Sequence, residues 1–489
     1  MENLNGQSEV VVLGAGVSGH TAALFLKRRL KGRARVTVIS PESEYNWIPS
    51  NIWVGVGRVK KEDVLIPLSP VYEKHGINFI QGRAVSLYPE GTQDDPGPQV
   101  GYISTNNSST ETEFVKFDFL INATGPKLNF AATPGLGPDG HSFSVCTAQH
   151  AQEASLELHK VIQKARSGIK QTLVVGMGHG SCTCEGAAFE YVFNVDTELR
   201  RAGVREQTRL IYLTNESELG DFGVGGIQLN FAGFITPSKI MAESLFYEKG
   251  IESITGAHVE RLDEGTVSYV TLNGERHGLN FDYAMLLPPF QGHLLKSFDR
   301  NGNDITQELF TPANFMKVDA DYTPKNFEDW KPSDWPQSYR SPKYENIFAV
   351  GIAFAPPHQI SAPAKNPEGL NITPAPPRTG MPSAVMGKVI ANNIADKILL
   401  GAYGQRTASM AEMGAACIAS IGTGFKEGSA ASITMSPIVP DFEKYPETGR
   451  NLSDTFGEVG KAGHWIKKIL HYMFIYKAKA KPLWWIIPE

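Results

Sequence analysis

The cysteines of this 489-residue chain are its most obvious candidates for redox chemistry. There are four of them, Cys146, Cys182, Cys184 and Cys417. So few in a chain of this length cannot form a disulfide framework, so each is buried, catalytic or incidental. Cys184 precedes a predicted helix over 185–203, and the positive end of a helix dipole lowers a thiol pKa and favours the thiolate. Cys184 is therefore a candidate nucleophile, whereas the spacing of Cys182 and Cys184 closes a disulfide poorly.

Glu190 and two histidines are candidate proton carriers. Glu190 follows Cys184 by close to two helical turns, and a carboxylate in an apolar site can have a raised pKa and shuttle protons. An ordinary surface glutamate is the alternative. His179 and His358 are further proton candidates, although most such histidines are merely hydrogen-bonded. No metal site is predicted.

A glycine-rich turn near the N-terminus indicates nucleotide binding. Gly14, Gly16 and Gly19 stand between an apolar strand and a helix, inside a strand–helix–strand unit over 9–39. The first glycine allows a tight turn, the second lets the backbone approach a pyrophosphate, and the third lets helix and strand pack closely. The helix N-terminus then offers free N–H groups to phosphates. Ser40 stands where an acidic residue normally binds the ribose, and its hydroxyl is the candidate substitute.

A second glycine turn repeats this pattern in mid-chain. Gly176, Gly178 and Gly180 follow an apolar strand over 172–175, and a further strand is predicted over 209–213. This turn could bind a nicotinamide cofactor. We favour the other interpretation, in which an inherited turn is reused to place cysteines. The sequence thus predicts an α/β fold with two Rossmann-like dinucleotide-binding domains in tandem plus a C-terminal amphipathic membrane-binding segment.

The order of these motifs resembles the two-dinucleotide-binding-domain flavoproteins, and in detail the sulfide:quinone oxidoreductases. The resemblance covers most of residues 8 to about 425. The segments that carry it, besides the first glycine turn, are 45–55, 123–125, 144–147, 184–190, 221–226, 348–351, 377–380 and 417–420. It implies FAD as cofactor and a quinone as electron acceptor. The implied cofactor-binding residues are Gly14, Gly16, Gly19, Ser40, Pro49, Ser50, Asn51, Thr124, Gly125, Gly351, Arg378, Thr379 and Gly380.

The resemblance also gives the cysteines a joint role. Cys184 and Cys417 would flank the flavin and oxidise sulfide to polysulfide by thiol–disulfide exchange. Cys146 would handle the bound sulfur chain or link to FAD, and Glu190 would shuttle protons. A loop over 352–358 would contact the quinone through Phe354 and His358. The alternatives are a type II NADH:quinone oxidoreductase and a membrane-docked flavin protein without turnover.

Composition and the C-terminus bear on partners and location. The net charge of −5 argues against a general nucleic-acid binder. No signal peptide and no membrane-spanning apolar run are recognised. Apolar residues from Trp465 to Phe474 recur at helical spacing with Lys467 and Lys468 between them, and a lysine- and tryptophan-rich stretch follows. This predicts a peripheral membrane protein, with lysines at the headgroups. The resemblance favours a homo-oligomer. The expected divisions are 1–165 (FAD domain), 166–300 (second Rossmann-like domain), 301–425 (return to the FAD domain) and 426–489 (membrane association).

Overall fold

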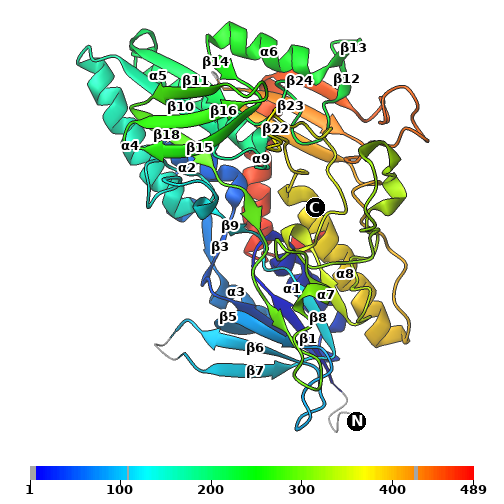
Figure 1. Cartoon of the computed structure of the whole chain (residues 1–489). Coiled ribbons are helices and arrows are strands. Elements are labelled where there is room, and N and C mark those ends of the chain that lie inside the picture. Colours follow the sequence, from blue (N-terminus) through cyan, green and yellow to red (C-terminus); the bar gives the residue numbers. More distant parts are fainter. Residues whose placement is uncertain (1–6, 107–109, 423–427) are drawn as a thin grey trace.

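The computed structural model describes residues 7–106, 110–422 and 428–489. Two parallel sheets lie at opposite ends of the molecule, with the C-terminal helix α9 between them (Figure 1). The first sheet has the order β21-β8-β1-β2-β5-β6-β7, and β20 pairs with β5. Strands β21 to β5 of that order are parallel, while β6 and β7 are antiparallel. Their bounds are β1 Ser8–Leu13, β2 Ala34–Ser40, β5 Asn78–Tyr88, β6 Gln99–Ser104, β7 Thr112–Lys116, β8 Phe119–Asn122, β20 Lys296–Ser297 and β21 Ile347–Ala349.

Two helices cover the central strand β1 and meet closely. Helix α1 (Val17–Leu30) connects β1 to β2, and α8 (Gly380–Leu400) packs against it. The close approach depends on Gly387, because a Cβ there would lie 2.3 Å from the carbonyl oxygen of Ser18. Strand β1 is buried on both faces, which explains its continuous apolar run. Helix α3 (Leu68–His75) precedes β5.

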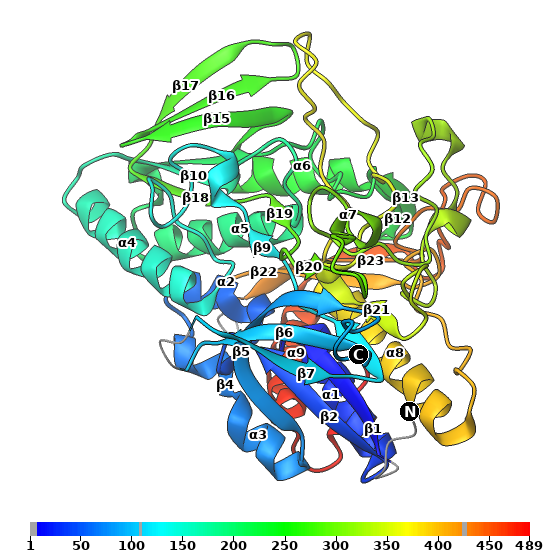
Figure 2. The same cartoon turned by 60° about the horizontal axis from the view of Figure 1, so that its bottom comes forward.

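The second sheet is the other Rossmann-like unit that the sequence predicted. Its four parallel strands have the order β14-β11-β10-β18, and a three-stranded antiparallel sheet β15-β16-β17 follows in the chain. Both are visible in the upper part of Figure 2. The bounds are β10 Gln171–Met177, β11 Thr208–Leu213, β14 Glu252–Ile254, β15 Ala257–Asp263, β16 Thr266–Thr271, β17 Arg276–Asn280, β18 Tyr283–Leu287, α4 Ala148–Arg166, α5 Glu185–Arg201 and α6 Ser238–Lys249.

A third sheet joins distant parts of the chain. Strands from the middle of the chain pair with C-terminal strands in the order β13-β12-β24-β23-β22, and helix α9 (Lys461–Ala478) packs on β22 and β23. The strands are β12 Gln228–Phe231, β13 Phe234–Pro237, β22 Ala415–Ile421, β23 Ser429–Met435 and β24 Phe456–Gly460. Shorter elements complete the fold, namely β3 Glu44–Asn46, β4 Leu65–Pro67, β9 Lys127–Leu128, β19 Phe290–Gln291, α2 Asn51–Gly55 and α7 Thr306–Leu309. Within the described ranges, no helix has the length and apolarity needed to cross a bilayer.

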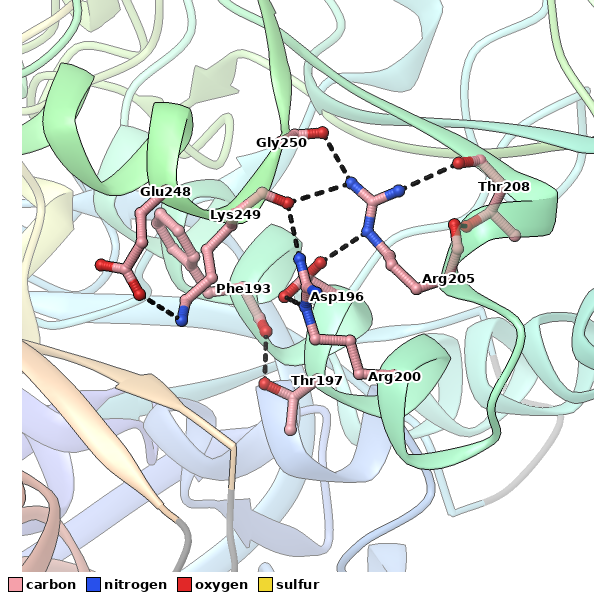
Figure 3. A network of polar contacts seen from close by, with 9 residues as sticks. All are labelled: Phe193, Asp196, Thr197, Arg200, Arg205, Thr208, Glu248, Lys249 and Gly250. Atoms are coloured by element: carbon pink, nitrogen blue, oxygen red, sulfur yellow. Dashed lines mark hydrogen bonds and ion pairs between the residues drawn. The ribbon is translucent and has the colours of Figure 1, made fainter.

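A buried carboxylate fixes the C-terminal end of α5, the helix that begins beside Cys184. Asp196 accepts hydrogen bonds from Arg205 at 2.6 Å and from Arg200 at 2.8 Å. Both arginines also donate to the carbonyl oxygen of Lys249 at the end of α6 (Figure 3). This network joins α5 to α6 and so fixes the orientation of α5, the helix whose first turn lies beside Cys184.

Candidate active site

The first glycine turn leaves a cradle that the chain itself does not fill. Gly14 has φ +92°, and a Cβ on it would lie 2.3 Å from the carbonyl oxygen of Ala123. A Cβ on Gly19 would lie 2.0 Å from the carbonyl oxygen of Gly14. A Cβ on Gly16, Gly125 or Gly380 would instead meet no atom within 4 Å. The glycines that shape the turn are packed, whereas those predicted to face the cofactor border open space, so these residues fit a dinucleotide.

The loop predicted to lie beside the flavin is tied to the C-terminal helix. Ser50 Oγ lies 2.7 Å from Nδ1 of His471 on α9, and both residues are buried. Asn51 donates to the carbonyl oxygen of Val145 at 3.2 Å. Pro49 lies in the short 3₁₀ turn just before α2. The side chains of Ser50 and Asn51 therefore hold α2 between α9 and the segment that carries Cys146.

The remaining predicted cofactor residues lie at strand ends. Ser40 is the buried last residue of β2. The Thr124 hydroxyl donates to Asn122 Oδ1 at 2.8 Å just beyond β8. Gly351 follows β21 with φ +67°, and a Cβ there would lie 2.1 Å from Ser18 Oγ. Since β1, β2, β8 and β21 are parallel, these residues share the carboxyl edge of the first sheet.

Arg378 is half-buried beside the start of α8. Its guanidinium donates to the carbonyl oxygen of Phe354 at 3.1 Å and lies over the rings of Phe315 and Phe354 at 4.8 and 5.2 Å. Burial lowers its pKa to about 10, which leaves it charged near neutral pH. Thr379 is the N-cap residue of α8, and Gly380 is the first residue of that helix. A positive charge and a helix N-terminus thus lie together, as the prediction for the flavin site requires.

Cys184 and Cys417 are brought together from sequence positions far apart. Cys184 caps α5 in a left-handed conformation, with φ 75°. Cys417 lies on β22, which packs against α5, and its sulfur is 3.1 Å from where a Cβ on Gly186 would stand. Cys146 is near enough that its thiolate would raise the pKa of Cys184. All four cysteines are free in the structure. The structure therefore groups Cys146, Cys184 and Cys417 around the first turn of α5.

The expected lowering of the Cys184 pKa is wrong. Burial raises it to about 12, and the carboxylate of Glu185 adds to that effect. The helix dipole is outweighed because the thiol is removed from water and lies beside an acid. Burial likewise raises the pKa of Cys146 to about 11 and that of Cys417 to about 11. Free thiols at these positions are protonated near neutral pH.

Glu190 forms a buried ion pair with the C-terminal helix. Both of its carboxylate oxygens contact Lys467 Nζ on α9, and Glu190 also accepts the Ser420 hydroxyl. Lys467 donates in addition to the carbonyl oxygen of Ile418, next to Cys417. The expectation that Lys467 reaches lipid headgroups is therefore wrong, because Lys467 is buried against Glu190.

Comparisons with known proteins agree with this arrangement. Residues 8–211 match the family described as pyridine nucleotide-disulphide oxidoreductase. The sulfide-quinone reductase of Aquifex aeolicus is 29% identical over 473 residues, covering 96% of this chain and 91% of that protein. The X-ray structure of the sulfide:quinone oxidoreductase from the same species has a TM-score of 0.74 at 27% identity, covering 97% of this chain and 92% of that one. Over nearly its whole length, the chain is therefore similar to sulfide:quinone oxidoreductases.

A second solved structure shares the fold but differs in sequence. NDH2 of Plasmodium falciparum in complex with NADH has a TM-score of 0.64 at 13% identity, covering 97% of this chain and 96% of that one. That likeness concerns the fold alone. Whether the second glycine turn of this chain can hold a nicotinamide must therefore be inferred from the contacts of the turn itself.

The second glycine turn is filled by the chain's own residues. Gly178 corresponds in the motif to Gly16, yet a Cβ on it would lie 2.5 Å from the Leu136 side chain. A Cβ on Gly180 would lie 2.9 Å from His258 Nδ1 and 3.0 Å from the carbonyl oxygen of Asn371. The space that Gly16 leaves open is thus closed at the second turn, which supports the interpretation that this turn places cysteines.

The histidine and aromatic candidates lie in packed surroundings. His179 meets the ring of His258 edge-on at 4.4 Å, and burial lowers its pKa to about 4. Phe354 is buried and packs edge-on against Tyr339 at 5.0 Å. The indole N–H of Trp335 donates to Nε2 of His358 at 2.8 Å. A quinone role for Phe354 and His358 stays a prediction.

Sequence reasoning missed a buried acidic group beside the cysteines. Glu185 is 1% exposed, and among the described residues neither of its carboxylate oxygens has a partner at hydrogen-bond geometry. Glu216 and Asp221 lie close enough that their charges raise its pKa further. Burial also raises the pKa of Glu216 to about 7. The available signal was the position of Glu185 directly after Cys184, at the start of a helix whose first turn is buried.

Proposed function

We propose that this chain oxidises sulfide to polysulfide and transfers the electrons to a membrane quinone, with FAD bound at the first glycine turn. The observation that carries the proposal is that Cys417 Sγ lies next to Gly186 in the first turn of α5, the helix that Cys184 caps. It occurs in a chain that aligns over 96% of its length with a protein named sulfide-quinone reductase. Sulfur transfer by thiol–disulfide exchange needs two cysteines close to each other, whereas a purely structural thiol does not.

The cysteines would act by thiol–disulfide exchange. Hydrosulfide attacks one sulfur of a Cys184–Cys417 disulfide or trisulfide, so one S–S bond forms and another breaks. The attacked sulfur becomes a persulfide, and the leaving electron pair and negative charge stay on the other sulfur as a thiolate or persulfide anion. Before each further attack the thiolate and the persulfide would re-form an S–S bond between the two cysteines, which releases two electrons and a proton, so that each round adds one sulfur to the chain until it is released. When bound, FAD supplies a two-electron acceptor that a quinone can reoxidise.

Neighbouring residues would hold the cofactor and protect the sulfur. The open positions at Gly16, Gly125 and Gly380 would receive the dinucleotide, and Arg378 would place a positive charge near the α8 N-terminus. Cys184 and Cys417 are both partly buried, which would limit the access of water to the sulfur chain. Cys146 would hold the growing chain, since its thiolate lies within electrostatic reach of Cys184.

The outer face of α9 would place the molecule on the bilayer. From Trp465 onward, its exposed side chains recur at helical spacing and are large and apolar or aromatic, namely Trp465, Ile466, Ile469, Tyr472 and Tyr476. Tyr472 is 71% exposed. An apolar stripe of this kind matches a helix lying in the membrane interface, from which a hydrophobic quinone is reached. The protein would then be a peripheral membrane protein.

The first test is the flavin spectrum of the purified protein under anaerobic conditions. Sulfide at micromolar concentration should bleach it, and a short-chain quinone should restore it. If NADH bleaches the flavin and sulfide does not, the proposed electron donor is wrong and the second glycine turn binds a nicotinamide.

Cysteine variants test the sulfur site separately. Cys184→Ser and Cys417→Ser should each abolish bleaching by sulfide while FAD stays bound. Cys182→Ser is the matched control, because only one residue separates Cys182 from Cys184 in the same turn. Cys182 is fully buried, and its thiol donates to the carbonyl oxygen of Leu287 at 3.1 Å. Equal loss in all three variants would contradict the assigned roles.

A further inference from the structure

A basic cavity lies where α1 and α3 end against the C-terminal segment. Its volume is about 290 Å³. The residues that line it are cationic or aromatic, namely Lys27, Arg28, Lys31, His75, Trp484 and Trp485. The C-terminal segment (red in Figure 2) runs beside α3, and the carbonyl oxygen of Ala480 lies 3.3 Å from His75 Nε2. No acidic residue is among the lining residues.

The cationic side chains around this cavity form no ion pair within the described part of the chain. Arg29 belongs to the same helix end but turns away, to pair with Asp396 of α8 at 2.8 Å. Lys27, Arg28 and Lys31 take part in none of the ion pairs that the described residues form. Since like charges gathered at one place repel each other, their arrangement around a cavity favours an anion from outside.

Aromatic contacts hold the cavity in shape. The guanidinium carbon of Arg28 lies 4.5 Å from the Trp485 ring, a cation–π contact that orients its donors. Trp484 is buried and meets Phe25 of α1 edge-on at 4.9 Å. Arg28 is therefore held in place before a ligand binds, and a planar guanidinium suits a phosphate group.

The same C-terminal segment exposes apolar side chains next to the cavity. Leu483 is 55% exposed and Ile486 is 67% exposed, and they flank Trp484 and Trp485 in the chain. Tryptophans beside cations, with apolar side chains exposed next to them, are typical of a protein surface at the level of lipid headgroups.

We propose that this cavity binds the phosphate of an anionic phospholipid, through Arg28, Lys27 and Lys31, with the acyl chains lying against Leu483 and Ile486. The inference rests on the proposed docking of α9 on the bilayer and adds a choice of lipid to it. An anionic headgroup would fix both the depth and the rotation of the molecule on the membrane, because the cavity and the α9 stripe would then be held at once.

The test compares vesicles of phosphatidylcholine with vesicles of equal parts phosphatidylcholine and phosphatidylglycerol, using the full-length protein with FAD bound. Each basic residue near an anionic surface contributes roughly 1 kcal/mol. The variant Arg28→Gln/Lys31→Gln should therefore bind the anionic vesicles about 30-fold more weakly. Its binding to neutral vesicles should not change. Lys164→Gln/Arg166→Gln is the matched control, since these residues also end a helix but do not line this cavity.

Each outcome decides a different point. A loss confined to the double variant and to anionic vesicles supports the headgroup site. Equal losses on both vesicle types, an equal loss in the control variant, or no loss at all would overturn it. Competition by inorganic phosphate beyond that of sodium chloride at equal ionic strength, without any preference for anionic vesicles, would assign the cavity to free phosphate instead. A wild-type protein that binds neither vesicle type would refute the membrane docking itself.

Discussion

Replacing Lys467 by Met should destabilise the docking of the C-terminal helix, and the contacts of Glu190 set the size of the free-energy loss. The change removes the cation and leaves the Glu190 carboxylate buried. Breaking a buried ion pair from one side costs about 3–5 kcal/mol. Glu190 keeps the Ser420 N–H at 3.1 Å and the Ser420 hydroxyl at 2.5 Å. Because these donors remain, we expect the lower value, about 3 kcal/mol.

The assay is amide hydrogen exchange, read peptide by peptide. If α9 opens as a unit, a loss of about 3 kcal/mol speeds exchange of its protected amides by roughly 150-fold. Amides of β1, in the distant core of the first sheet, should keep their wild-type rates. The double variant Glu190→Gln/Lys467→Met should regain most of the protection, because a neutral Gln needs no counter-charge and can still accept from Ser420.

Two results would refute this reasoning. Unchanged exchange in Lys467→Met would show that the ion pair contributes nothing to the docking of α9. Exchange in the double variant as fast as in the single variant would show that the loss comes from the packing of the lysine stem and not from an unpaired charge.

Three further predictions concern the cofactor turn, the anchor of α5 and the buried acids. Gly16→Val should fold, as its circular dichroism will show, but its visible absorbance should show little bound FAD, because the valine side chain enters the open space at the turn. Gly32→Ala, whose new methyl group also meets open space, should keep FAD. Asp196→Asn should destabilise α5 by about 3 kcal/mol in hydrogen exchange, because its two arginine partners lose their counter-charge. Burial raises the pKa of Glu216 from 4.5 to about 7, so between these pH values the folded chain holds a proton that the unfolded chain releases. As pH rises from 4.5 to 7, the wild type should therefore lose about 3 kcal/mol of folding free energy relative to Glu216→Gln. Melting temperatures of the two proteins that change in parallel with pH would contradict this.

The sequence supported the fold far better than the electrostatics of the site. The apolar run before Gly14 and its copy before Gly176 predicted both parallel sheets, because a strand buried on both faces has a simple pattern. The start of α5 at Glu185 was also expected. The proximity of Cys417 to this helix came only from family resemblance, since no local pattern predicts the pairing of β22 with the rest of the third sheet.

The wrong predictions concern the surroundings of single side chains, which set their pKa values and partners and which a local sequence pattern does not show. The dipole argument for Cys184 considered its own helix, whereas burial and the neighbouring Glu185 decide its pKa. Lys467 was placed by the spacing of α9, but its partner Glu190 is 277 positions away in the chain. Helical spacing shows which face a residue occupies, and it does not show what that face meets.

The filled second glycine turn also bears on how this chain could change over evolutionary time. Leu136, His258 and Asn371 approach the turn from three separate segments, and Asn371 does so with its backbone. A substitution that shortens Leu136 would leave the other two contacts in place, and no side-chain change removes a carbonyl oxygen. Nicotinamide binding at this turn would thus require several coordinated changes, including a displaced loop. Under the proposed function, descendants of this sequence would therefore keep to electron donors that react through the cysteines.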